Sequence, residues 1–172
     1  KTGLRLQQDP YFCFDYISHI HQQYSLNPIF FWLIGDYGTY DKNISHNNKY
    51  FRQLVHLHAQ QYPCGIHPSY RSNQSQDLLD KEIHRLEKIT KLRTFRSRQH
   101  FLKLKLPTSY RRLINLGIQQ DYSMGYASQP GFRASIAQSF PWFDLEQNKV
   151  QGLEIIPFQL MDVTLNTYLE LT

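Results

Sequence analysis

The sequence predicts an α/β protein in which a parallel sheet is covered by outer helices, and three observations support this class. Segments with helical periodicity alternate with short apolar segments bounded by turn residues. The apolar segment 28–34, closed by Gly35, is rich in β-branched and aromatic side chains, as expected of a strand buried on both faces. The spacings suit right-handed crossovers between parallel strands. An open sheet and a closed barrel both fit this pattern.

Four amphipathic helices are expected. Asp9 and Pro10 favour a helix over 9–24, and a second is expected over 48–61. A third begins at Asn73 or Ser75, with Leu79, Ile83 and Leu86 on its apolar face. Its solvent face is expected to carry Asp80, Lys81, Glu82, Arg85, Glu87 and Lys88. Pro107 opens the fourth helix, which ends at Gly117.

Five strands are expected between and after these helices, at 28–34, 64–67, 95–102, 118–124 and 153–161. A helix start is expected near Asn166. At 172 residues the chain has the size of one domain, 1–172, which is large enough to bury a core. It does not begin with Met, and we expect a fragment truncated at both ends.

The composition limits the partners of this domain. The net charge is +5, but the basic residues are scattered, and their densest stretch, 88–112, indicates a solvated helix and strand edge; no nucleic-acid partner is expected. Two cysteines define no disulfide framework, and neither a signal peptide nor a membrane span is visible, which favours a cytoplasmic location. Aromatic residues make up 15% of the chain, which suits a thick core or a cleft with stacking platforms.

Polar side chains follow the ends of the predicted strands. Because the carboxyl ends of parallel strands meet at one edge of a sheet, one pocket can collect these side chains. They are Asp36, Asp41, His67, Arg98, His100, Asp121, Arg133 and Asp162.

Histidine and aspartate are suitable ligands for zinc, or for iron, cobalt or manganese, and such a metal activates water and polarises a carbonyl. Arg98 can orient a carboxylate or hold substrate oxygens, and His100 or an aspartate can move a proton. Structural roles remain as alternatives: Arg98 can pair with Asp121 or Asp162, His100 can be buried and hydrogen-bonded, and Asp162 can cap a helix.

The chain resembles the polysaccharide deacetylase superfamily (NodB homology, carbohydrate esterase family 4), in a divergent bacterial branch. The resemblance spans almost the whole sequence and depends on a set of stretches. These are FFWLIGDYGTYDKN (30–43), GIHPSY (65–70), SRQHFL (97–102), DYSMGYA (121–127), GFRA (131–134) and MDVTL (161–165).

The resemblance implies a distorted (β/α) barrel with fewer than eight strands, incomplete at its N-terminus, and a metal-dependent hydrolase that removes N- or O-acetyl groups from a glycan. His67 resembles the metal-binding histidine of the second motif, Arg98 the arginine that orients the catalytic aspartate, and Asp162 a residue beside the acid/base group. The chain departs from the family in two places. The family's second histidine is Arg71 here, and the Asp-rich first motif is expected upstream of Lys1.

Two functions are therefore expected from the sequence. The first is a zinc-dependent deacetylase with His67 as metal ligand and with catalytic roles for Arg98, His100, Asp121 and Asp162. The second is a non-catalytic carbohydrate-binding domain on the same scaffold, in which aromatic residues such as Tyr37 and Tyr40 stack on sugar rings. In either case the substrate would be held by Asp36, Asp41, Tyr70, Tyr126 and Arg133.

Overall fold

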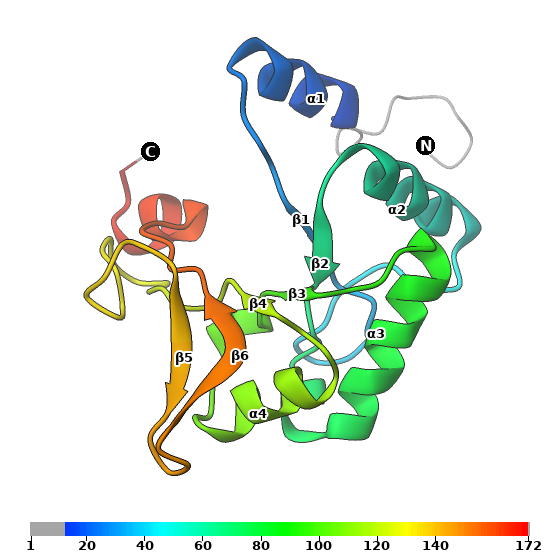
Figure 1. The fold of residues 1–172 in the computed structure, drawn as a ribbon. Coiled ribbons are helices and arrows are strands. Elements are labelled where there is room, and N and C mark those ends of the chain that lie inside the picture. The colour runs from blue at the N-terminus through cyan, green and yellow to red at the C-terminus, as the bar shows by residue number, and fades with distance from the viewer. Residues whose placement is uncertain (1–12, 172) are drawn as a thin grey trace.

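The computed structural model describes residues 13–171 and places them in a mixed α/β fold (Figure 1). The helices are α1 (Phe14–Gln23), α2 (Lys49–Gln61), α3 (Gln76–Thr90) and α4 (Thr108–Asn115). The strands are β1 (Phe30–Trp32), β2 (Cys64–Ile66), β3 (Arg96–Ser97), β4 (Gln120–Asp121), β5 (Phe140–Asp144) and β6 (Lys149–Ile155). Within this part of the chain no helix is both long enough and apolar enough to cross a membrane.

The six strands form one sheet in the order β1-β2-β3-β4-β6-β5, and over the described residues this sheet does not close. Strands β1 to β4 and β6 pair in parallel, which confirms the predicted α/β class. Strand β5 is antiparallel to β6, and the expectation of a purely parallel sheet was wrong at this edge. Its sequence, FPWFD, contains Pro141 and alternates between buried and exposed side chains, so it lacks the apolar run of a central strand.

Local sequence signals explain where three helices begin or end. The side chain of Asn48 accepts hydrogen bonds from two amides of the first turn of α2, and Ser75 accepts one from Leu78 at the start of α3. The chain leaves α4 through Gly117 at φ +79°, a conformation that favours glycine. The predicted helix 9–24 begins outside the described residues and continues as α1.

All five predicted strands are shorter than expected, and two of these differences affect expected site residues. The predicted strand 95–102 keeps only β3, after which the chain forms a 3-10 turn at His100–Leu102. The last strand begins earlier than predicted and ends at Ile155, so 156–161 is a loop. Asp162 therefore follows a loop, not a strand end, and precedes a short π-helical segment, Thr164–Tyr168. Short strands place more of the chain in loops at one edge of the sheet.

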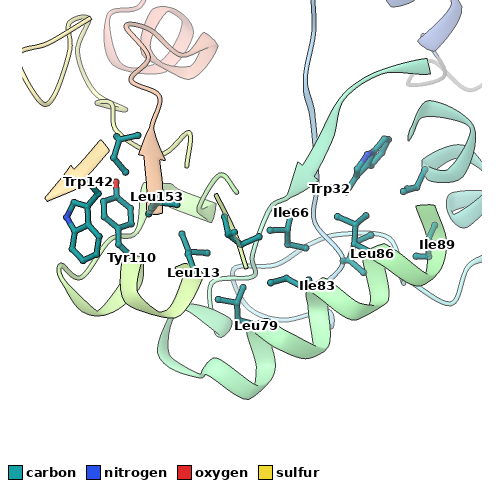
Figure 2. Close-up of a cluster of buried hydrophobic side chains, with 14 residues drawn as sticks. Trp32, Ile66, Leu79, Ile83, Leu86, Ile89, Tyr110, Leu113, Trp142 and Leu153 are labelled. Carbon is teal, nitrogen blue, oxygen red and sulfur yellow. The ribbon is translucent and has the colours of Figure 1, made fainter. Parts of the chain in front are cut away.

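The main core lies between the sheet and the helices α3 and α4 (Figure 2). Trp32 of β1 and Ile66 of β2 face the apolar side of α3, while Leu113 of α4 lies near Leu153 of β6. The predicted apolar face of α3 is buried, but Glu82 of this helix has no exposed surface. Its placement on the solvent face was wrong, because it lies between the apolar positions at helical spacing and points toward the loop after β2.

Candidate functional site

The parallel strands bring the loops after β1, β2, β3 and β4 to one edge of the sheet (Figure 1). His67 lies one residue beyond β2, where its amide donates to the Trp32 carbonyl at 2.9 Å. Arg98 lies one residue beyond β3, and its amide donates to the Ile66 carbonyl at 3.0 Å. The backbone ladder therefore continues past both strand ends and fixes these two residues side by side.

The imidazole of His67 is held in one orientation and one tautomer. Its Nδ1 lies 2.5 Å from the carbonyl oxygen of Arg98. Because a carbonyl oxygen can only accept, Nδ1 carries the proton and Nε2 of the neutral ring keeps its lone pair. Burial, with a further contribution from the charge of His100, lowers the pKa of His67 to about 4, so the ring is neutral at pH 7.

His100 is oriented by a buried carboxylate. Its Nδ1 lies 2.8 Å from Oδ1 of Asp41, whose side chain is 1% exposed. The same Oδ1 accepts the amide of Tyr70 at 2.9 Å, so Asp41 connects the loops after β1, β2 and β3. The rings of His67 and His100 are neighbours, with centroids 4.9 Å apart. The side chain that we expected to bind substrate, Asp41, is thus engaged with protein groups.

A second buried carboxylate supports the loop that follows His67. Oε2 of Glu82 accepts the amide of Ser69 at 2.9 Å, and burial raises the pKa of Glu82. Ser69 Oγ in turn accepts the amide of Ser72. Gly35 allows these segments to approach, because a Cβ atom there would lie 2.6 Å from Cβ of Ser69. The loop after β2 therefore has a fixed shape.

The side chain of Arg98 points toward β4 and the loop after β6. Nη1 donates to the carbonyl of Tyr122 at 3.1 Å, and the guanidinium lies over the ring of Phe158, 4.1 Å from its centroid. Burial lowers the pKa of Arg98, whereas the nearby carboxylates of Asp121 and Asp162 raise it. The predicted grouping of Arg98 with these two aspartates is present. Asp162 itself is exposed.

Asp121 is fully buried at the end of β4. It accepts the amide of Ser123 at 3.0 Å and the hydroxyl of Ser123 at 2.9 Å. Burial nevertheless raises the pKa of Asp121 to about 6, because the hydrogen bonds and the charge of Arg98 compensate only part of the desolvation. This carboxylate titrates close to neutral pH but has no surface of its own.

Aromatic side chains form a rim beside the two histidines. Rings of Tyr40 and Tyr70 lie 4.3 Å apart, and Phe101 makes edge contacts with both. Phe101 is 61% exposed and also packs against His100. A groove of about 510 Å³ adjoins this rim and is lined by Tyr40, Tyr70 and Arg71, among other residues. We call Tyr40, Tyr70 and Phe101 the aromatic rim.

Other residues expected at the site lie outside this cluster or at its margin. Asp36 is exposed and pairs with Arg85 of α3 at 2.9 Å. Tyr126 is half-buried and Arg133 is exposed, both in the loop after β4. The positive charge of Arg133 acts to lower the pKa of the buried Tyr110 hydroxyl, although burial raises this pKa more strongly. Tyr37 is exposed, and Lys42 lies over its ring.

Sequence reasoning missed three residues that shape the site. Glu82 was detectable, since it lies three residues after Leu79 and four before Leu86, on the inner face of its helix. Ser123, two residues after Asp121, has the spacing at which an aspartate accepts a nearby amide. Phe101 had no comparable signal, because its exposure depends on φ +57° in the 3-10 turn.

A zinc ion in a protein commonly has three or more side-chain ligands. Within residues 13–171 there is no group of three or more His, Cys, Asp or Glu side chains placed to hold a metal. Two imidazoles nevertheless fit: each has Nδ1 hydrogen-bonded to an oxygen, as metal-binding histidines commonly do. The Nε2 atoms of His67 and His100 form no hydrogen bond to a described residue, and neither is among the buried polar atoms that lack a partner.

Comparison with known proteins adds no family to these observations. No protein-family model matches the chain, and no curated protein matches it.

Proposed function

We propose that this domain belongs to a metal-dependent hydrolase that removes N- or O-linked acetyl groups from a glycan, on a distorted (β/α) barrel of the NodB type. The observation that carries the proposal is the neutral imidazole of His67, whose proton is fixed on Nδ1 at the carboxyl edge of a parallel sheet. The resemblance of the strand-end stretches to polysaccharide deacetylases supports the same reaction and implies a glycan as the substrate class.

In this proposal His67 holds the metal through Nε2. A zinc ion bound there would supply Lewis-acid chemistry, which would polarise the acetyl carbonyl and lower the pKa of a bound water molecule. Arg98, always charged and fixed by Tyr122 and Phe158, attracts the exposed carboxylate of Asp162 electrostatically. Asp162 is the only exposed residue among the four expected catalytic residues, so it is the one we assign to proton exchange with substrate or water.

The two remaining expected catalytic residues take different roles. Asp121 has no exposed surface and supports Arg98 electrostatically. His100 is held by Asp41 and presents a second ring nitrogen beside His67. The aromatic rim and the adjoining groove offer a surface on which a sugar ring stacks.

The test measures acetate release from N-acetylated and O-acetylated oligosaccharides by the full-length protein supplied with zinc. His67→Ala and Arg98→Ala should each reduce the rate at least about 100-fold, within the range expected when a metal ligand or an orienting charge is lost. The matched control is His84→Ala, since His84 is exposed on α3. Equal rates in the wild type and in both site variants would overturn the assignment of these residues.

A second candidate function is glycan binding without catalysis, and the aromatic rim is the observation that favours it. Its most exposed member, Phe101, is available to a ligand without rearrangement. This function predicts oligosaccharide binding by the domain in the presence of a chelator, with no acetate released. Metal-dependent turnover would exclude it.

A further inference from the structure

We infer that His100 supplies the second imidazole ligand of the metal site, together with His67, and that Asp41 is its positioning residue. The position at which the resembled family carries a second histidine holds Arg71, whose side chain is exposed and lines the groove. A guanidinium is not a metal ligand, because it stays protonated. Arg71 therefore cannot be a second nitrogen ligand, and a histidine of another loop would have to take that role.

His100 meets the geometric requirement for that role. Two imidazoles that share one zinc ion through Nε2, with zinc–nitrogen bonds of about 2.0 Å and a tetrahedral angle, have ring centroids about 5 Å apart. The centroids of His67 and His100 are 4.9 Å apart, and the rings are inclined by 57°. His67 directly follows β2, whereas His100 lies in the 3-10 turn after β3, where the carboxylate of Asp41 holds its ring.

The outer contacts of both rings complete the match. Asp41 accepts from Nδ1 of His100 at 2.8 Å, and the Arg98 carbonyl accepts from Nδ1 of His67 at 2.5 Å. A carboxylate or carbonyl behind each histidine fixes the ring and leaves Nε2 for the metal. Asp41 is in turn fixed by the amide of Tyr70, so the support of His100 is itself rigid.

Two imidazoles would occupy two of the four positions of a tetrahedral zinc ion and would leave two positions for other ligands. The choice of zinc as the metal rests on the proposed function. The test of the site, however, measures metal binding and not turnover. In this arrangement the loop after β3 supplies both Arg98 and the metal ligand His100, which are two positions apart.

The test titrates the metal-free full-length protein with Zn²⁺ and, separately, with Co²⁺. Co²⁺ should give one exchangeable, strongly shifted N–H proton resonance for each bound imidazole, because both Nδ1 atoms carry protons. We expect two such resonances in the wild type and one in His100→Asn. The asparagine amide keeps a donor for Asp41 but lacks a nitrogen at the Nε2 position, so this variant separates metal binding from folding.

Affinities give the quantitative readout. Zinc binding should weaken more than about 100-fold in His67→Ala and in His100→Asn, and about 10-fold in Asp41→Asn, the range of an outer-contact loss. His84→Ala should bind as the wild type does, because His84 is exposed on α3 and contacts Asp80. Circular dichroism establishes that each variant is folded.

The outcomes separate this site from the proposed reaction. In one outcome, His67→Ala loses zinc binding while His100→Asn keeps both resonances and full zinc affinity. This outcome would overturn the role of His100 and leave the hydrolase proposal standing. Absence of any zinc binding by the wild type would overturn the site as well as metal-dependent catalysis. Zinc bound by both histidines, without acetate release from any glycan, would support the site and refute the reaction.

Discussion

The site edge has two halves with opposite electrostatic character. The histidine half contains His67, His100 and Asp41, and the arginine half contains Arg98, Asp121 and Asp162. In the histidine half both rings have Nδ1 hydrogen-bonded to an oxygen, which leaves Nε2 as the reactive atom. In the arginine half a buried carboxylate has a raised pKa even though a guanidinium lies nearby.

One residue separates the halves. The carbonyl of Arg98 accepts from His67, while its guanidinium points toward Tyr122 and Phe158. The backbone of this residue therefore serves the histidine half and its side chain serves the arginine half. Neighbouring strand ends can thus hold a neutral imidazole, that of His67, and a guanidinium, that of Arg98, with the guanidinium directed away from the imidazole.

The largest expected effect is a pH-dependent change in stability at Asp121. The folded-state pKa is raised from 3.8 to about 6, so the ionised form destabilises the folded protein. This penalty is absent below pH 3.8, develops as the pH rises through about 6, and amounts to about 3 kcal/mol above it. Asp121→Asn removes the ionisation. Its free energy of unfolding should therefore rise relative to wild type between pH 4 and pH 7.

Urea unfolding at a series of pH values measures this difference. The absolute stability of Asp121→Asn also reflects altered hydrogen bonds with Ser123, so the slope with pH is the informative quantity. Parallel pH profiles for the two proteins would show that Asp121 has an ordinary pKa. The contrast between the two halves would then disappear.

The second effect compares two aspartates of the same loop. Asp41→Ala leaves the amide of Tyr70 and Nδ1 of His100 without their acceptor, which should cost about 2 kcal/mol. Asp36→Ala removes an ion pair between an exposed carboxylate and the largely buried Arg85, which keeps its hydrogen bond to the Ile34 carbonyl, and should change the free energy of unfolding by less than about 1 kcal/mol. Thermal or urea unfolding at pH 7 measures both. Similar losses in the two variants would contradict the positioning role of Asp41.

The class of fold was predictable because its signals are local. Apolar runs such as 28–34 indicated buried strands, and Ser75, one of the two residues expected to begin the third helix, caps it. The antiparallel strand β5 was not predictable, since its pairing with β6 is set by a hairpin and not by its own hydrophobic pattern. The strands were predicted too long because apolar residues such as Leu102 are equally buried in a turn.

The site was predictable as a set of residues but not as a set of contacts. Parallel strand ends place His67, Arg98 and Asp121 at one edge, and the order of strands made this foreseeable. The direction of each side chain was not, because it depends on long-range acceptors. Asp41 lies 59 residues from His100, and Glu82 supports a loop from another element. Such pairs leave no periodic trace in the sequence.

A small effect on stability is expected at Phe101, on the outer side of the histidine half. A non-glycine residue at φ +57° is strained by about 1–2 kcal/mol, and glycine removes that strain. Phe101→Gly also loses ring contacts with His100 and Tyr70 and gains chain entropy when unfolded. These terms oppose one another, so the free energy of unfolding should change by less than about 1 kcal/mol.

Ligand binding should respond differently to the same substitution. If the aromatic rim stacks on a sugar ring, Phe101→Gly should weaken oligosaccharide binding about fivefold, which corresponds to about 1 kcal/mol of stacking. Tyr50→Ala is the matched control, since Tyr50 is an exposed aromatic residue on α2. Calorimetric titration of both variants measures the difference. Unchanged affinity in Phe101→Gly would mean that the strain at this position serves the packing of His100 and not the glycan, because the ring contacts His100 directly.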